Sequence, residues 1–280
     1  MEFHENDLVS LHLQGLKEIA NFSSSKQSIQ FWEHPYLGKI LVINGEIQHV
    51  ENYQPLYHEM LVHLPAAFIP ELESALILGG GSLFAAYEIL KYPSVKTLVL
   101  CDYDPDVLSL METYYPHARA VLQDPRFCFV SADAREYISN TTEKFDLVVN
   151  DCFNLASESK TARTSLYSQL SALCNNDGVC ADIIYRHIFE RETTLDSLHY
   201  VHNNYNVIFS LVTVPEYPGI LHLETIWGKT KNLSQNLSMP LNKFQQHCIK
   251  AHSMLFQFFS PANLPFYLYL PPYIRNLFTL

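Results

Sequence analysis

Glycine or acidic residues follow three successive apolar stretches in the middle of the chain. The first stretch runs into Gly79, Gly80 and Gly81, where a ligand can approach the backbone closely at the start of a helix. The second ends at Asp102, where a carboxylate can accept hydrogen bonds from two ribose hydroxyls, and the third ends at Asp133, placed to meet an adenine amino group. Ligands of parallel α/β sheets bind at the carboxyl ends of the strands, so these residues predict one nucleoside site.

The residues around this site narrow the chemistry. Ser82, Leu83 and Phe84 follow the glycines, so the Gly-x-Gly-x-x-Gly pattern of dinucleotide sites is absent, which favours an adenosyl sulfonium of the S-adenosylmethionine type. Asp151 ends a fourth apolar stretch. Its carboxylate would therefore lie at the same edge of the predicted sheet as those of Asp102 and Asp133.

The periodicity of the sequence predicts the elements that position these residues. Residues 28–32 alternate polar and apolar side chains, and residues 39–43 and 46–50 are strand-like on either side of the hairpin signal Asn44-Gly45, which predicts an antiparallel β-meander. Residues 57–63 have helical spacing, and we expect that helix to stop before Pro65. Strand and helix patterns then alternate, which predicts an α/β domain with a parallel sheet and helices on its faces. We expect a small β-domain over residues 1–55 and the catalytic domain over residues 56–280.

The overall composition excludes several functions. Acidic residues outnumber basic ones, 29 to 18, and no Lys/Arg-rich run is present, so a nucleic-acid surface is not expected. Of the thirteen histidines, only His199 and His202 are close together in a helical pattern, so no metal site is expected. No apolar stretch approaches membrane-spanning length and no secretory signal is evident, so we expect a cytoplasmic protein that does not bind membranes.

Two sequence blocks are specific, Tyr-His-Glu-Met at residues 57–60 and Tyr-Pro-Gly at residues 217–219. They occur together with Gln27, residues 38–48, His63, residues 79–81, 92–95 and 124–126, Asp133, Asp151, Pro215, Glu216 and residues 258–264. In these motifs the chain resembles the spermidine synthase (polyamine aminopropyltransferase) family over nearly its whole length, and the order of the two specific blocks makes chance resemblance improbable.

The resemblance implies an amino-terminal β-domain on a Rossmann-like, class I S-adenosylmethionine-dependent methyltransferase-type domain. It implies decarboxylated S-adenosylmethionine as donor, 5'-methylthioadenosine as product, a putrescine-like small-molecule amine as acceptor, and a homodimer or larger assembly. Asp151 would be the general base, with Tyr57 beside it, and Tyr217 would line the amine channel. The donor would contact Gln27, Gln48, His58, Gly79, Gly80, Gly81, Ser82, Asp102 and Asp133.

Two acids of the family pattern are missing. Ser82 stands where the family's Gly-Gly-Gly-Asp-Gly-Gly has the acid that meets the donor's amine, and Asn154 stands where Asp-Ser-Ser-Asp-Pro has its second acid. A hydrogen bond to a charged group contributes about 1.5–3 kcal/mol, so both losses bear on substrate recognition. Two other acids are candidate substitutes for the missing ones: Asp182, at a position where the family usually has Gln, and Glu216. The residues expected to bind the acceptor are Asn154, Asp182 and Tyr217.

These departures leave other functions open. Without an acid at Ser82, the site would accept ordinary S-adenosylmethionine, which keeps its carboxylate, better than a site with that acid would. Arg186 could then pair with the donor carboxylate. The protein would in that case be a 3-amino-3-carboxypropyl transferase or an enzyme that cyclises the donor's side chain. A methyltransferase fits the fold but not the set of Tyr57, Asp151 and Tyr217. A degenerate adenosyl-binding protein without activity is the remaining alternative.

Overall fold

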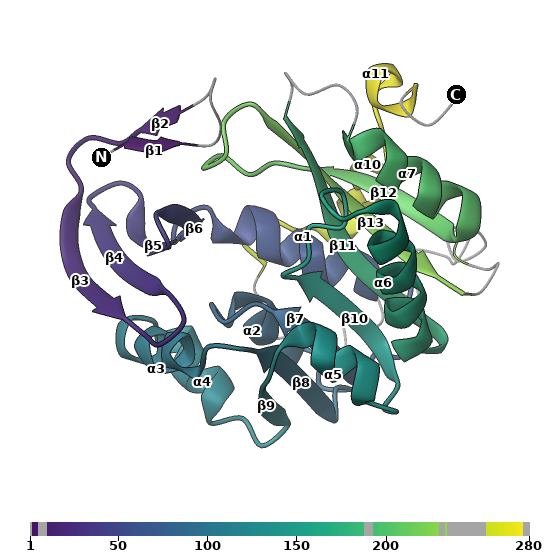
Figure 1. Cartoon of the computed structure of the whole chain (residues 1–280), viewed down its shortest axis with the longest axis horizontal. Coiled ribbons are helices and arrows are strands. Elements are labelled where there is room, and N and C mark those ends of the chain that lie inside the picture. Colours follow the sequence, from purple (N-terminus) through teal and green to yellow (C-terminus); the bar gives the residue numbers. More distant parts are fainter. Residues whose placement is uncertain (1, 5–9, 188–192, 230–232, 234–255, 277–280) are drawn as a thin grey trace.

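The computed structural model describes residues 2–4, 10–187, 193–229, 233 and 256–276, with the backbone alone for residues 4, 185–187 and 193–194. Two units lie side by side in Figure 1, an amino-terminal antiparallel sheet and a larger α/β unit. Helix α1 (Gln54–Ala66) runs between them and begins beside the expected boundary at residue 55. We propose that boundary for the two units.

The amino-terminal unit is an antiparallel meander, as predicted. Its four described strands pair in chain order: β3 (Lys17–Ser23), β4 (Ser28–His34), β5 (Gly38–Ile43) and β6 (Glu46–Val50). The turn between β5 and β6 has positive φ at both Asn44 (53°) and Gly45 (88°), the conformation that Asn-Gly favours in tight hairpins. A short hairpin of β1 (Glu2–His4) and β2 (Ser10–His12) lies beside β6 and packs Phe3 into its core.

The larger unit is built on a seven-stranded sheet within the described residues. Its order is β12-β13-β11-β10-β7-β8-β9. The strands are β7 (Ser74–Gly79), β8 (Thr97–Asp102), β9 (Phe127–Ser131), β10 (Phe145–Asp151), β11 (Cys174–His187), β12 (Asn206–Val212) and β13 (Ile220–Gly228). The first five are parallel and the last two pair antiparallel at one side. The parallel strands therefore bring their carboxyl ends to one edge of the sheet.

Helices cover both faces of this sheet (Figure 1). They are α2 (Phe84–Leu90), α3 (Pro105–Tyr114), α4 (Pro116–Leu122), α5 (Ala134–Asn140), α6 (Lys160–Leu173) and α7 (Thr193–Asn204), followed near the carboxyl end by η1 (Pro261–Asn263), α10 (Leu264–Tyr267) and α11 (Pro272–Arg275). Period-two alternation divides the core, with Leu76 and Leu78 packing on one face and Ala75 and Ile77 on the other. No helix in the described ranges is long and apolar enough to span a membrane.

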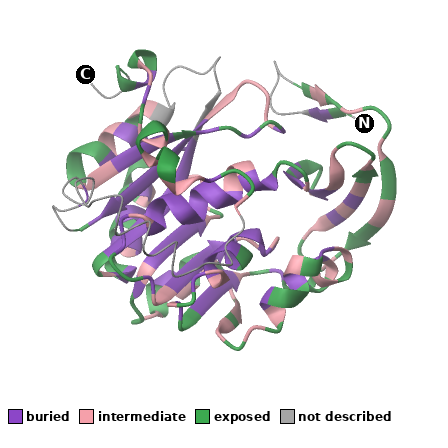
Figure 2. Cartoon of the chain, turned by 180° about the vertical axis from the view of Figure 1, so that it is seen from behind, coloured by how far each residue is buried: buried purple, intermediate pink, exposed green. Residues whose placement is uncertain are grey.

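Helix α1 is buried on almost every side, as Figure 2 shows. The expectation that it stops before Pro65 was wrong, because the helix continues to Ala66. Pro65 lies in the last turn, where its missing N–H removes one intrahelical hydrogen bond and no further turn has to follow. The whole Tyr-His-Glu-Met block therefore lies on one helix between the two sheets.

Candidate active site

A cavity of about 520 Å³ opens between the meander and the carboxyl ends of the parallel strands. Residues from β5, β6, α1, the strand ends and the segment before β13 line it. All the predicted site residues except Asp133 and Asp182 are among them, namely Gln27, Gln48, Tyr57, His58, Gly79, Gly80, Gly81, Ser82, Asp102, Asp151, Asn154 and Tyr217. Segments that are distant in the sequence therefore share one cavity.

The glycine turn after β7 has no room for side chains. Gly79 and Gly80 have φ of 78° and 75°, and a Cβ on Gly79 would lie 2.6 Å from Cβ of Cys152. A Cβ on Gly81 would lie 3.1 Å from Oδ2 of Asp102. Leu83 also takes a left-handed φ of 64°, at a position where the family pattern has glycine. This conformation costs a side-chain-bearing residue about 1–2 kcal/mol, so Leu83 stores strain beside the site.

Asp102 lines the cavity at the end of β8. Burial raises the pKa of its carboxyl, while backbone N–H groups, including that of Asp104 at 2.9 Å, oppose the rise by stabilising the charged form. Next to it, the Tyr103 hydroxyl donates a 2.8 Å hydrogen bond to Oε1 of Gln27. Ser24 in the same β3–β4 loop donates to Asp104 at 2.7 Å. The meander is thus attached to the end of β8 beside Asp102.

The other predicted donor residues differ in how they meet the cavity. His58 lies on α1 with Nδ1 3.1 Å from the carbonyl oxygen of Gln54, and burial lowers its pKa to about 4, so its ring is neutral at pH 7. Gln48 is exposed and donates weakly to the carbonyl of Glu46 at 3.4 Å. Asp133 caps helix α5 by accepting from the N–H groups of Arg135 and Glu136, and its neighbour Ala134 lines the cavity instead.

Tyr57 and Asp151 meet in the lining of the cavity. The Tyr57 hydroxyl, from α1, donates a 2.8 Å hydrogen bond to Oδ1 of Asp151, at the end of β10. Burial raises the pKa of Asp151 to about 6, and the Tyr57 hydrogen bond opposes this rise. Burial and the nearby Asp151 charge hold the pKa of Tyr57 well above its usual range, so Tyr57 remains a donor. A buried carboxylate with a pKa near neutrality is suited to general base catalysis.

Asp182 supports the loop after β10 from outside the cavity lining. Its Oδ1 accepts a 2.7 Å hydrogen bond from Nδ2 of Asn150, which also donates to the carbonyl of Phe153 at 2.9 Å. Because side chains alternate along β11, the neighbour Ile183 lines the cavity instead of Asp182. Burial raises the pKa of Asp182 to about 7. Asp182 therefore contacts the site through Asn150.

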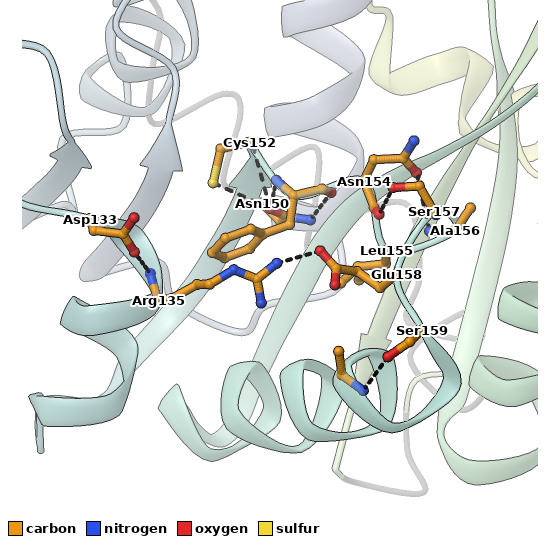
Figure 3. Close-up of polar contacts among 12 residues, drawn as sticks. Asp133, Arg135, Asn150, Cys152, Asn154, Leu155, Ala156, Ser157, Glu158 and Ser159 are labelled. Carbon is orange, nitrogen blue, oxygen red and sulfur yellow. Dashed lines mark hydrogen bonds and ion pairs between the residues drawn. The ribbon is translucent and has the colours of Figure 1, made fainter. Parts of the chain in front are cut away.

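The loop itself uses the amide of Asn154, as Figure 3 shows. Its Oδ1 accepts from the N–H groups of Ala156 at 3.1 Å and Ser157 at 3.3 Å. On the other side of the loop, the Arg135 guanidinium from α5 pairs with Glu158 and lies 5.0 Å from the centre of the Phe153 ring. Arg135 therefore ties the loop to the start of α5, close to the cavity residue Ala134.

Glu59 has a role that sequence reasoning did not assign, and Glu216, a candidate substitute for the missing acids, lies at the cavity. The Glu59 carboxylate accepts hydrogen bonds from the N–H groups of residues 257, 258 and 259, at 2.7, 2.9 and 2.6 Å, and so attaches the carboxyl-terminal segment to α1. Its place in the Tyr-His-Glu-Met block was the available signal. Glu216 is 6% exposed and lines the cavity beside Tyr217, whose hydroxyl donates to the carbonyl of Ile47.

The Asp, Glu, Lys and Arg side chains among the described residues of the cavity lining are all acidic. Its described residues include the acids Glu46, Asp102, Asp151 and Glu216 and no Lys or Arg. The side chain of Arg186 lies outside the described part of the structure. No cluster of metal-ligating side chains occurs among the described residues. The cavity is therefore suited to cationic substrates, such as a sulfonium and an amine.

Comparison with known proteins places this geometry in a family. Residues 54–237, more than half of the chain, match the spermine/spermidine synthase domain. The polyamine aminopropyltransferases of Sodalis glossinidius and Serratia proteamaculans (strain 568) are 30% and 29% identical to it, over 56% and 54% of this chain and 55% and 53% of theirs. This chain thus spans about half the length of the curated relatives it matches.

Solved structures share the fold. The spermidine synthase from Thermotoga maritima aligns with a TM-score of 0.78 at 21% identity, covering 94% of this chain and 88% of that one. A spermidine synthase in complex with the transition state analogue AdoDATO gives the same TM-score and identity, covering 94% and 87%. With the matched domain and the shared fold, the chain belongs to the spermine/spermidine synthase family.

Proposed function

We propose that this protein transfers an aminopropyl group from decarboxylated S-adenosylmethionine to a small amine and releases 5'-methylthioadenosine. The observation that carries this proposal is the partly buried, hydrogen-bonded pair of Tyr57 and Asp151. The pair lies in a cavity that is also lined by the glycine turn, Asp102 and Tyr217. Family membership supports the same reaction class.

The chain's own groups account for each step. Asp151 accepts a proton from the ammonium form of the acceptor, which frees the nitrogen lone pair. That nitrogen attacks the aminopropyl carbon next to the sulfonium, the C–N bond forms, and the C–S bond breaks with its electron pair going to sulfur. The product amine carries the aminopropyl group, and the sulfur becomes a neutral thioether. Since a sulfonium is already activated, the enzyme mainly supplies position and a deprotonated nucleophile.

The cavity lining favours the decarboxylated donor over S-adenosylmethionine. A donor carboxylate would enter a cavity whose described lining contains four carboxylates and no Lys or Arg. Burial of a charge without a partner is costly, so a donor without this carboxylate fits better. The alternative, a 3-amino-3-carboxypropyl transferase or a side-chain cyclase, is favoured by Ser82, which offers no charge to the donor's amine, and would pair the donor carboxylate with Arg186, whose side chain lies outside the described part of the structure. A homodimer or larger assembly stays a prediction that light scattering can test.

Analysis of the adenosyl product tests the proposal. The purified protein is incubated with each donor and a panel of diamines, monoamines and amino acids, and the products are followed by mass spectrometry. We expect methylthioadenosine from the decarboxylated donor only when an amine is present. S-adenosylhomocysteine would instead identify a methyltransferase. If neither donor is consumed and neither shifts the melting temperature, the chain is not an enzyme of this class.

A further inference from the structure

We propose that Glu216 binds the second ammonium group of a diamine acceptor, in place of the acid that is missing at Asn154. This inference rests on the proposed function and specifies which amines the cavity selects. Glu216 is placed by the segment before β13 and precedes Tyr217 in the chain. Both side chains line the cavity.

The groups expected to bind the acceptor cannot supply a charge. The amide oxygen of Asn154 is bound by two N–H groups of its own loop. Asp182 does not line the cavity, and the neighbouring position that does is the apolar Ile183. Val214 and Ile220 add further apolar surface. A diamine would therefore lack a carboxylate at these positions.

The four acids of the described lining differ in what they can do. Asp102 is the acid expected to bind the donor's ribose, and Asp151 is paired with Tyr57. Glu46 begins β6 beside the exposed hairpin turn and is itself exposed, so water screens its charge. This leaves Glu216, which is 94% buried.

The Glu216 carboxylate is incompletely satisfied. Within the described residues, its buried Oε2 has no hydrogen-bond partner. Burial raises the pKa of Glu216, and backbone N–H groups of Glu216 and Val50 only partly oppose this rise. A buried carboxylate is stabilised by a cation that donates hydrogen bonds to it. The ammonium of a bound substrate can supply this cation.

The position of Glu216 in the cavity suits this role. The neighbouring Tyr217 lies close enough to Tyr57 for its charge to affect the pKa of Tyr57. The ring centre of Tyr217 is 5.7 Å from that of His222, which also lines the cavity. Through Tyr217, the segment that carries Glu216 thus borders the reacting pair. One ammonium at Asp151 and a second at Glu216 would fix the orientation of a diamine.

A pair of matched acceptors tests the inference. Putrescine and n-butylamine have the same carbon chain, and only putrescine carries a second ammonium. Their kcat/KM values are measured for the wild-type protein, Glu216→Gln and the comparison variant Glu46→Gln. We expect Glu216→Gln to lower kcat/KM for putrescine about tenfold or more, through KM, and to change that for n-butylamine less than about threefold. Glu46→Gln should leave the ratio between the two amines unchanged.

Other outcomes separate this inference from the proposed function. In one outcome the wild type forms methylthioadenosine, but Glu216→Gln lowers kcat/KM equally for both amines, or only Glu46→Gln removes the preference for putrescine over n-butylamine. Glu216 is then not the group that selects the diamine, and the proposed transferase function is unaffected. If no amine is consumed, the proposed function fails, and thermal shifts decide the role of Glu216. The role then requires putrescine to stabilise the wild type more than n-butylamine does, with the difference lost in Glu216→Gln. Glu216→Ala also removes the charge and serves as the variant of choice if Glu216→Gln does not fold.

Discussion

The hydroxyl of Tyr57 donates a 2.8 Å hydrogen bond to Oδ1 of Asp151, joining helix α1 to the end of strand β10 inside the cavity. This single contact brings together two segments that are 94 residues apart. Tyr57 stabilises the charged form of a carboxyl whose pKa burial has raised to about 6. The pair is therefore tuned so that Asp151 is ionised at neutral pH and still able to accept a proton.

Removal of the base should stop transfer. We expect Asp151→Asn to lower kcat by about 10²–10⁴-fold, because an amide cannot take the proton from the acceptor amine. Donor binding, measured by calorimetry, should change little. Turnover within about twofold of the wild type would remove Asp151 from the role of base.

The same substitution should affect stability in a pH-dependent way. The pKa of Asp151 is raised from 3.8 to about 6, so the folded protein binds the proton more tightly than the unfolded chain. The free energy of unfolding therefore falls as pH rises from about 4 to about 6. We expect Asp151→Asn to raise the melting temperature at pH 8 and to leave it nearly unchanged at pH 4. A lower melting temperature at pH 8 would contradict the raised pKa.

Tyr57→Phe should shift the acidic limb of the pH–rate profile. The Tyr57 hydrogen bond lowers the pKa of Asp151, so its loss should move the midpoint of the limb in kcat/KM to higher pH. The sign follows because only the ionised carboxylate acts as base. We expect the rate to fall most below pH 7 and to recover partly at pH 8. A uniform loss at every pH would mean that Tyr57 acts only through substrate contact.

The pair of Arg135 and Glu158 should affect donor binding more than chemistry. Glu158→Gln removes the ion pair that ties the loop of residues 152–159 to α5. A partly exposed pair contributes about 0.2–1 kcal/mol, so we expect the donor KM to rise no more than about fivefold with kcat unchanged. Glu73→Gln, which breaks the exposed pair with Lys96, is the control. An equal effect in both variants would exclude a role of the loop contact.

Glu59 should stabilise the fold. Glu59→Ala leaves the N–H groups of residues 257–259 without their acceptor, so we expect the free energy of unfolding to fall by about 2–4 kcal/mol. Glu71→Ala, at an exposed position after α1, should change it by less than about 0.5 kcal/mol. Equal urea midpoints for the two variants would contradict this role.

The sequence was most informative where a local pattern determines local structure. Asn44-Gly45 predicted the hairpin, and the alternation of strands and helices predicted the sheet whose ends form the cavity. Glycines that close packing requires, such as Gly79, were also readable, because few other residues fit such turns.

Contacts across the fold were harder to predict. Asp182 was chosen because it ends a strand, but a one-residue step along a strand reverses the face, and Ile183 is the residue that lines the cavity. Likewise, nothing local shows that Glu59 binds residues 257–259, about 200 positions further along the chain. Such roles depend on which groups tertiary packing brings within hydrogen-bond distance.

The donor preference tests the central claim most directly. The wild-type protein is given putrescine with equal concentrations of decarboxylated and carboxylated S-adenosylmethionine, and the modified amine is identified by mass spectrometry. The acidic lining predicts a product that carries an aminopropyl group, with little or none that carries an aminocarboxypropyl group. A predominantly aminocarboxypropylated product, or no modified amine at all, would contradict it.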